Sequence, residues 1–223
     1  TFFNFHPDMV RSAIPDAWSY ASPAALLEVR ATAAAAVLRR LVTDVDDAAK
    51  KVEPLLRQPI DAADAPGRSL FAANRDVAVP SDPVAALWQA TTTLREHRGD
   101  GHVSVLTSEG LDGCEAHVLF AMVHDVPRDV YQRSRGWSDD DWSAALSELF
   151  GKGWLAADGT ITSTGREVHG EIEARTDASA AGPWRTLGTA GTARLAALLA
   201  PLAERIVGRV VPYPNPIGVP RAG

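Results

Sequence analysis

The sequence contains one cysteine, Cys114, and no uninterrupted apolar run that approaches the roughly 18 residues of a membrane-spanning helix. A single cysteine excludes an internal disulfide framework and any zinc or iron–sulfur site that needs several thiolates. No secretory signal is visible either. We therefore expect a cytoplasmic protein whose cysteine is a small residue of the core.

Basic side chains are also in the minority. The 223 residues carry 28 acidic side chains against 22 basic ones, a net charge of −6. This balance argues against a protein that coats nucleic acid through a broad basic surface. With 46% apolar residues, the chain is long enough to form one large or two small domains around a proper core.

The chain begins Thr1-Phe2-Phe3-Asn4-Phe5, without a methionine and with three phenylalanines in five residues. Because chain ends are usually polar, this start is typical of an ordered interior segment and favours a trimmed chain. Two alternatives stay open. One is a processed precursor in which the amine of Thr1 activates its own hydroxyl as a nucleophile. The other is a second chain that supplies a missing N-terminal segment.

Helical patterns fill the N-terminal part of the sequence. Residues 7–20 predict a short helix interrupted near Pro15, and the spacing of apolar residues predicts a long helix over 23–49. Residues 67–83 are rich in turn-forming residues and predict a long connection. We therefore expect residues 1–82 to form an N-terminal helical region.

A leading helix and a helix-turn-helix succession occupy residues 83–180. The leading helix is expected to end near Gly99, and another helix covers 111–123. From residue 127 the order is short helix, turn, helix, two-stranded ribbon, helix. That is the order of elements in a winged helix-turn-helix.

Two local signals support this order. Ser138 is well placed to cap a helix over residues 139–151. Asp158-Gly159 lies between two short segments, residues 154–156 and 160–162, and is the strongest hairpin-turn signal in the chain. The sequence therefore predicts a small two-stranded wing.

The C-terminal region, residues 181–223, predicts a long helix over 183–210 and a proline-rich tail. The prolines require the tail to be extended, and Tyr213 and Ile217 provide side chains that it can bury. We expect this tail to pack on its own subunit or on a partner. The predicted fold class is mainly α, with an N-terminal helical layer, a winged helix-turn-helix and a long C-terminal helix.

The phrase LSELFGKGWL followed by DGTITSTGREV is similar to the end of the recognition helix, the wing and the next helix of MarR-type regulators. More of the chain resembles an actinobacterial group of helix-turn-helix-type proteins without an assigned function. The matching pieces are FNFHPDMV, LFAAN, LREHRGDGHV, RGWSDDDW, RTDASAAGPWRTLG and PNPIG. The resemblance further implies an additional helical segment at the start of such proteins, which we expect this chain to lack. The resemblance implies a fold, and fold alone does not imply function.

The predicted winged region has few groups that bind phosphate. Residues 127–177 contain six basic and ten acidic side chains, a net charge of −4. The helix that would enter a DNA groove starts with Asp139-Asp140-Asp141, which would meet a polyanion directly. We therefore expect a winged helix that has lost DNA binding. The alternative is a MarR-like, ligand-responsive regulator that binds DNA as a dimer.

The densest polar cluster spans residues 95–102. Its two imidazoles, two carboxylates and two guanidiniums suit anion binding or proton transfer. Three side chains are candidate catalytic groups: His97, Asp100 and His102. Two others, Arg95 and Arg98, are candidate ligands for a carboxylate or phosphate. The alternative is a solvated helix end, where cations complement the helix dipole.

Further histidines and tryptophans complete the set of candidates. His6 is expected either to cap the first helix or to line a ligand cavity, and Trp88 is expected to line that cavity, whereas His117 and His124 are expected at the surface or at a dimer contact. No regular metal-ligand spacing appears, so no metal site is predicted, and no motif indicates a cofactor. The favoured function is small-molecule binding, either by a binding protein or by an enzyme of specialised metabolism, in a homo-oligomer.

Overall fold

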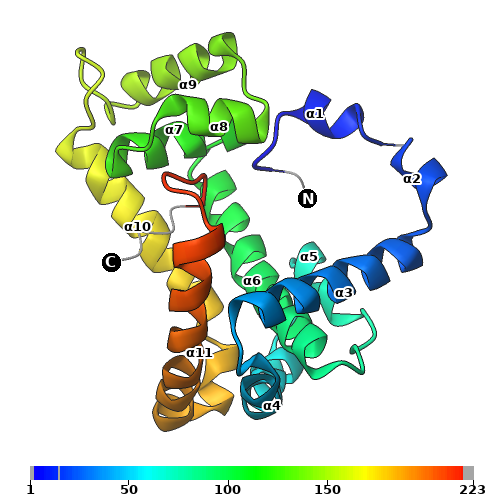
Figure 1. Cartoon of the computed structure of the whole chain (residues 1–223). Coiled ribbons are helices and arrows are strands. Elements are labelled where there is room, and N and C mark those ends of the chain that lie inside the picture. Colours follow the sequence, from blue (N-terminus) through cyan, green and yellow to red (C-terminus); the bar gives the residue numbers. More distant parts are fainter. Residues whose placement is uncertain (1–2, 15, 218–223) are drawn as a thin grey trace. The chain divides into compact units, whose positions relative to one another are not determined.

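The computed structural model describes residues 3–14 and 16–217, which are mainly helical (Figure 1). The elements, in order, are α1 (Pro7–Arg11), α2 (Ala17–Tyr20), α3 (Pro23–Leu41), α4 (Val45–Ala62), α5 (Ser69–Arg75), α6 (Pro83–Ser108), α7 (Gly113–His124), α8 (Arg128–Arg135), α9 (Asp139–Gly151), α10 (Ser163–Ala180), the 3₁₀ helix η1 (Pro183–Thr186) and α11 (Gly188–Val210). The mainly α prediction is confirmed. The hypothesis about a Thr1 nucleophile lies outside the described residues.

The chain forms two compact units, each built from separate segments of the sequence. The first unit contains the described residues of 1–17, 102–176 and 212–220, and the second contains those of 18–101 and 177–211. Each unit has its own apolar core.

In the first unit, α7 packs on α8 and α9. The most deeply buried side chains of this core include Val118, Tyr131, Trp142 and Leu149, each at most 2% exposed. They come from all three helices, so burying them requires α7, α8 and α9 to meet. This three-helix core contains the predicted helix-turn-helix.

Local signals define the turn between α8 and α9. Helix α8 ends at Gly136, whose φ of 80° suits a residue without a side chain. The predicted cap of α9 is confirmed: Ser138 Oγ accepts a hydrogen bond from the Asp141 backbone N–H (3.1 Å), and the Asp141 carboxylate accepts one from the Ser138 N–H (2.8 Å). This reciprocal pair satisfies two donors at the start of the helix.

The predicted two-stranded wing is wrong in its extent. Among the described residues, the segment between α9 and α10 contains one antiparallel bridge, Leu155 with Ile161, and no strand. The turn at Asp158 is present, because its carboxylate accepts a hydrogen bond from the Thr160 N–H (3.0 Å). Backbone hydrogen bonds flank this bridge on both sides, from the Ala156 N–H to the Thr160 carbonyl (2.8 Å) and from the Thr162 N–H to the Trp154 carbonyl (3.0 Å). The hairpin ends there because α10 begins at the next residue, where Thr162 Oγ1 accepts from the Gly165 N–H (3.0 Å).

In the second unit, α4 packs on α11 and η1, and α3 packs on α4 and α11. The single helix expected over residues 23–49 is divided into α3 and α4. Val42 and Val45 flank the break and are at most 1% exposed, and Val42 has an extended backbone. Turning the chain here buries both valines in the core. The free energy gained by this burial outweighs the local preference for one continuous helix.

Helix α6 also differs from expectation, because it continues past Gly99 to Ser108. A Cβ atom at Gly101 would lie 2.8 Å from Arg68 Nη1 and 2.9 Å from Ser179 Oγ. Gly101 therefore allows a close approach within the second unit, and it does not end the helix.

The C-terminal prediction is corrected in two places. The helix expected over 183–210 is divided into η1 and α11 at Leu187. In the tail, Tyr213 is 63% exposed and Ile217 56% exposed, whereas Asn215 between them is 4% exposed. The expectation that Tyr213 and Ile217 are buried on their own subunit is therefore wrong, because Asn215 takes the buried position between them. Their packing on a partner stays a prediction.

Candidate functional site

The structure places the two arginines of the polar cluster in ion pairs of the second unit. Arg95 Nη1 lies 2.6 Å from Glu96 Oε1, and Arg98 Nη2 lies 3.0 Å from Asp177 Oδ1. Both arginine side chains are well exposed, at 69% and 44%. Their assignment as anion ligands stays a prediction.

His97 and Asp100 face α5. The His97 ring is 4% exposed and packs edge-on against Phe71, with ring centroids 5.0 Å apart. Asp100 Oδ2 accepts a hydrogen bond from the Phe71 N–H (2.9 Å), and the His97 carbonyl accepts one from Arg68. Burial, reinforced by the positive charge of Arg68, lowers the pKa of His97 below its usual value. These contacts fasten α5 to α6.

His102 and His6 belong to the first unit. His102 Nδ1 lies 2.9 Å from Thr176 Oγ1. His6 Nδ1 accepts a hydrogen bond from the Asp8 N–H (3.2 Å) and thereby caps α1. Trp88 belongs to the second unit, where the Arg30 guanidinium lies 5.0 Å from its ring centroid. The candidate residues are thus distributed over both units, and their proposed roles stay predictions.

His117 corrects the expectation of a surface residue, because it is only 7% exposed. Its Nδ1 accepts a hydrogen bond from Trp137 Nε1 (3.0 Å). Burial, reinforced by the positive charge of Arg135, lowers the pKa of His117 to about 3. The apolar neighbours one turn away, Cys114 and Ala121, were the available sequence signal for its inward position.

Cys114 is buried as expected, at 4% exposed. Burial raises the pKa of its thiol to about 12. Since the thiolate is the nucleophilic form, the side chain fits a core residue and does not fit a reactive cysteine.

A cavity of about 840 Å³ in the second unit was not predicted from the sequence. Its walls are α3, the segment of residues 76–82 and the start of α6. The apolar lining residues are Ala24, Leu27, Ala31, Ala35, Ala36, Ala73, Val77, Ala78, Val79, Pro80 and Ala85. The available signal was the alanine-rich face of α3, which has too little side-chain volume to fill the space beside it.

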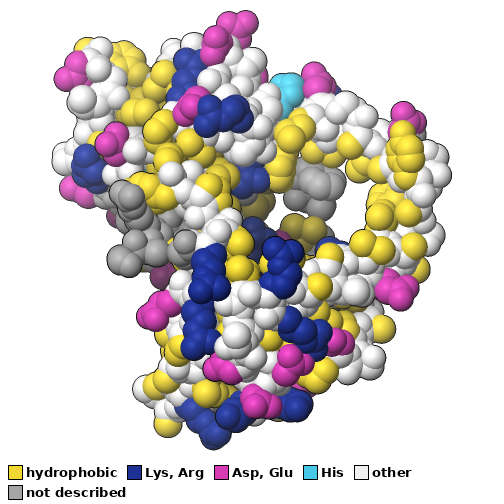
Figure 2. Space-filling model, in the orientation of Figure 1, with side chains coloured by type: hydrophobic (Ala, Val, Ile, Leu, Met, Phe, Trp, Pro, Cys, Tyr) yellow, Lys and Arg dark blue, Asp and Glu magenta, His cyan; other side chains and the backbone are white. Residues whose placement is uncertain are grey.

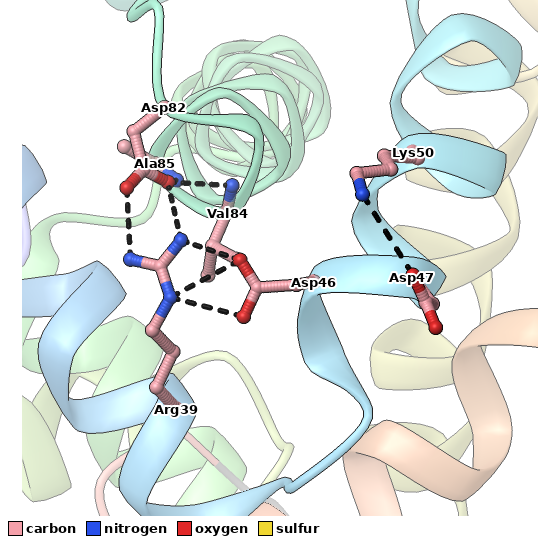
Figure 3. Close-up of polar contacts among 7 residues, drawn as sticks. All are labelled: Arg39, Asp46, Asp47, Lys50, Asp82, Val84 and Ala85. Atoms are coloured by element: carbon pink, nitrogen blue, oxygen red, sulfur yellow. Dashed lines mark hydrogen bonds and ion pairs between the residues drawn. The ribbon is translucent and has the colours of Figure 1, made fainter.

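One arginine fixes the walls of this cavity (Figure 3). Arg39 on α3 donates to Asp46 on α4 through Nε (3.0 Å) and Nη2 (2.6 Å), and to Asp82 through Nη1 (2.8 Å). Asp82 in turn accepts hydrogen bonds from the backbone N–H groups of Val84 (2.8 Å) and Ala85 (3.1 Å) at the start of α6. The Arg39 hydrogen bonds lower the pKa of both carboxyl groups below the usual value.

The exposed face of α9 is the surface that would meet DNA in a helix-turn-helix protein. Its exposed side chains are acidic, small or apolar, namely those of Asp139, Asp140, Ser143, Ala144, Ser147, Glu148 and Phe150. The basic side chain of Arg128 on α8 is paired with Asp139, which also accepts from Gln132 Nε2 (2.8 Å). Figure 2 shows acidic and basic side chains interspersed over α8 and α9.

The packing of α7, α8 and α9 defines the class as helix-turn-helix, and a family comparison agrees. The chain belongs to a helix-turn-helix family, whose model matches residues 1–212. This membership gives the chain a fold like that of DNA-binding regulators. No curated protein and no solved structure matches the chain. Within the part of the chain that the structure describes, no helix combines the length and the apolar character needed to cross a membrane.

Proposed function

We propose that this protein binds a small molecule in the cavity of the second unit. The observation that carries the proposal is the cavity itself. Its volume of about 840 Å³ lies within the range of about 300 to 1,000 Å³ that ligand sites occupy. A mostly apolar wall with a few polar groups is also the usual lining of such sites.

The proposal is for binding and not for catalysis in this cavity. None of the candidate catalytic residues His97, Asp100 and His102 is among its lining residues. The polar lining residue Gln89 accepts a hydrogen bond from Arg30 (3.2 Å) and donates one to the Asn74 carbonyl (3.1 Å). These contacts suit a wall of fixed shape, which favours a preorganised binding site.

Filling the cavity tests this function. Replacing Ala31, which lines the cavity, by tryptophan is expected to weaken the binding of the neutral apolar dye Nile red by about tenfold or more, since the ring occupies the dye's space. Ala33→Trp is the matched control, because Ala33 is exposed on the same helix and does not line the cavity. Fluorescence titration measures both affinities. Equal affinity of Ala31→Trp and the unmodified protein would contradict the proposal.

We also propose that α9 has lost the ability to read DNA. Phosphate contacts provide most non-specific affinity, and base recognition needs side chains such as Arg, Asn or Gln on the groove-facing helix. Among its exposed residues, α9 offers none of these, and Asp139 to Asp141 lie at its start. The second candidate, a MarR-like regulator that binds DNA as a dimer, is favoured by the membership in a helix-turn-helix family.

An electrophoretic mobility shift assay separates the two candidates. With the region upstream of the protein's own gene as the probe, we expect no shift at 50 mM salt and micromolar protein. Real phosphate contacts would produce a shift at this salt that is lost steeply by 200 mM, because counterion release makes such binding salt-dependent. That result would overturn the loss of DNA binding and favour the regulator.

A further inference from the structure

Four charged side chains line the cavity of the second unit: Glu28, Arg39, Asp76 and Asp82. Three are acidic and one is basic, so the lining has a formal charge of −2. The sign of the charge that a ligand would meet depends on which of these four groups are already paired.

Arg39, the only basic side chain in the lining, is fully engaged. It forms hydrogen bonds with both oxygens of Asp46 (2.6 and 3.2 Å to Oδ1, 3.0 Å to Oδ2) and with both oxygens of Asp82 (3.1 and 2.8 Å), as Figure 3 shows. An anionic ligand would have to displace one of these two carboxylates to bind Arg39. Because Arg39 joins α3, α4 and the start of α6, such displacement would also loosen the wall.

Glu28 and Asp76 are in the opposite situation. Within residues 3–14 and 16–217, neither side chain has a hydrogen bond or an ion pair with another residue. They come from different walls, Glu28 from α3 and Asp76 from the segment that follows α5. Two carboxylates without basic partners therefore border one mostly apolar space.

We infer that the ligand of this cavity is an apolar molecule that carries a protonated amine. The inference rests on the proposed function and specifies the ligand class. The ammonium group pairs with Glu28 and Asp76, and the apolar frame contacts the alanine, valine and leucine side chains of the wall. Anionic ligands are disfavoured because the unpaired charges of the lining are negative.

Three compounds with the same apolar frame test the ligand class by isothermal titration calorimetry at pH 7. They are 4-phenylbutylamine, 4-phenylbutanol and 4-phenylbutyrate, with charges of +1, 0 and −1. We expect the amine to bind about tenfold more tightly than the alcohol, and the carboxylate to bind most weakly. This factor corresponds to two ion pairs with the exposed side chains of Glu28 and Asp76, each contributing about two- to fivefold.

Neutralising the two acids locates the effect. Glu28→Gln and Asp76→Asn are each expected to weaken the binding of the amine about two- to fivefold and to leave the binding of the alcohol unchanged. Asp61→Asn removes the same charge from an exposed position of α4 outside the cavity, and it is expected to leave the binding of the amine unchanged.

The experiments test the proposed ligand class and the proposed binding cavity separately. If the alcohol or the carboxylate binds as tightly as the amine, the ligand class is overturned. The ligand class is also overturned if none of the three compounds binds while Ala31→Trp still weakens Nile red binding. In that case the proposed binding cavity is retained. If Nile red binding is insensitive to Ala31→Trp, the proposed function itself fails.

Discussion

Replacing Trp142 by alanine is expected to lower the free energy of unfolding of the first unit by about 3 to 5 kcal/mol. Trp142 is 1% exposed on the inner side of α9. Its ring stacks with Tyr131 at a centroid distance of 5.9 Å, and the Arg128 guanidinium lies 5.9 Å from the ring centroid. The substitution removes these contacts and leaves a cavity in the core that joins α7, α8 and α9. Urea titration followed by circular dichroism measures the loss.

Phe150→Ala is the control for this prediction. Phe150 is an aromatic residue in the last turn of the same helix, but it is 53% exposed. Its replacement is expected to cost less than about 1 kcal/mol, because little apolar surface leaves the core. Similar losses for Trp142→Ala and Phe150→Ala would show that the buried face of α9 is assigned incorrectly.

Acidification from pH 7 to pH 5 is expected to cost the protein about 2 kcal/mol of stability through His117 alone. The pKa of this ring is about 3 in the folded protein, against 6.5 as its ordinary value. Between these two values, the unfolded chain binds a proton that the folded chain excludes. The contribution of His117 is therefore complete above pH 6.5 and falls by about 1.4 kcal/mol per pH unit as the pH drops toward 3.

His117→Gln isolates this contribution. The glutamine amide can still accept the hydrogen bond from Trp137 Nε1, but it does not titrate. Urea unfolding at pH 7 and pH 5 is expected to show about 2 kcal/mol less pH dependence in the variant than in the unmodified protein. The difference between the two proteins is the relevant quantity, since His97 and His169 also have lowered pKa values and remain in both. An equal pH dependence would show that His117 is accessible to protons in the folded state.

The starts of several helices could be predicted from the sequence because they depend on nearby residues. Ser138 caps α9 through groups three residues apart, and Pro23 and Pro83 begin helices where expected. The turn at Asp158 was predicted for the same reason. The strands beside it were not correctly predicted, because α10 begins at Ser163, directly after the one bridge and its flanking hydrogen bonds, and leaves no residues for a longer strand.

Exposed apolar side chains show another limit of local patterns. Leu26, Val29 and Val37 on α3 are 43%, 65% and 40% exposed, and hydrophobic side chains are visible on this part of the surface in Figure 2. The periodicity of α3 predicted a helix correctly, but it did not predict which face of the helix packs. That choice depends on α4 and α11, which follow later in the chain.

The sequence by itself determined the helical class of this protein, the cap of α9 and the acidic start of that helix, because each depends on residue type and short spacing. Only the tertiary structure decided where residues 23–49 break and where the cavity lies. The cavity is the space between residues 24–39 and 73–89, and its walls are joined by Arg39 and Asp82, 43 positions apart. No local periodicity encodes such a space, since it exists only where distant segments fail to fill the volume between them.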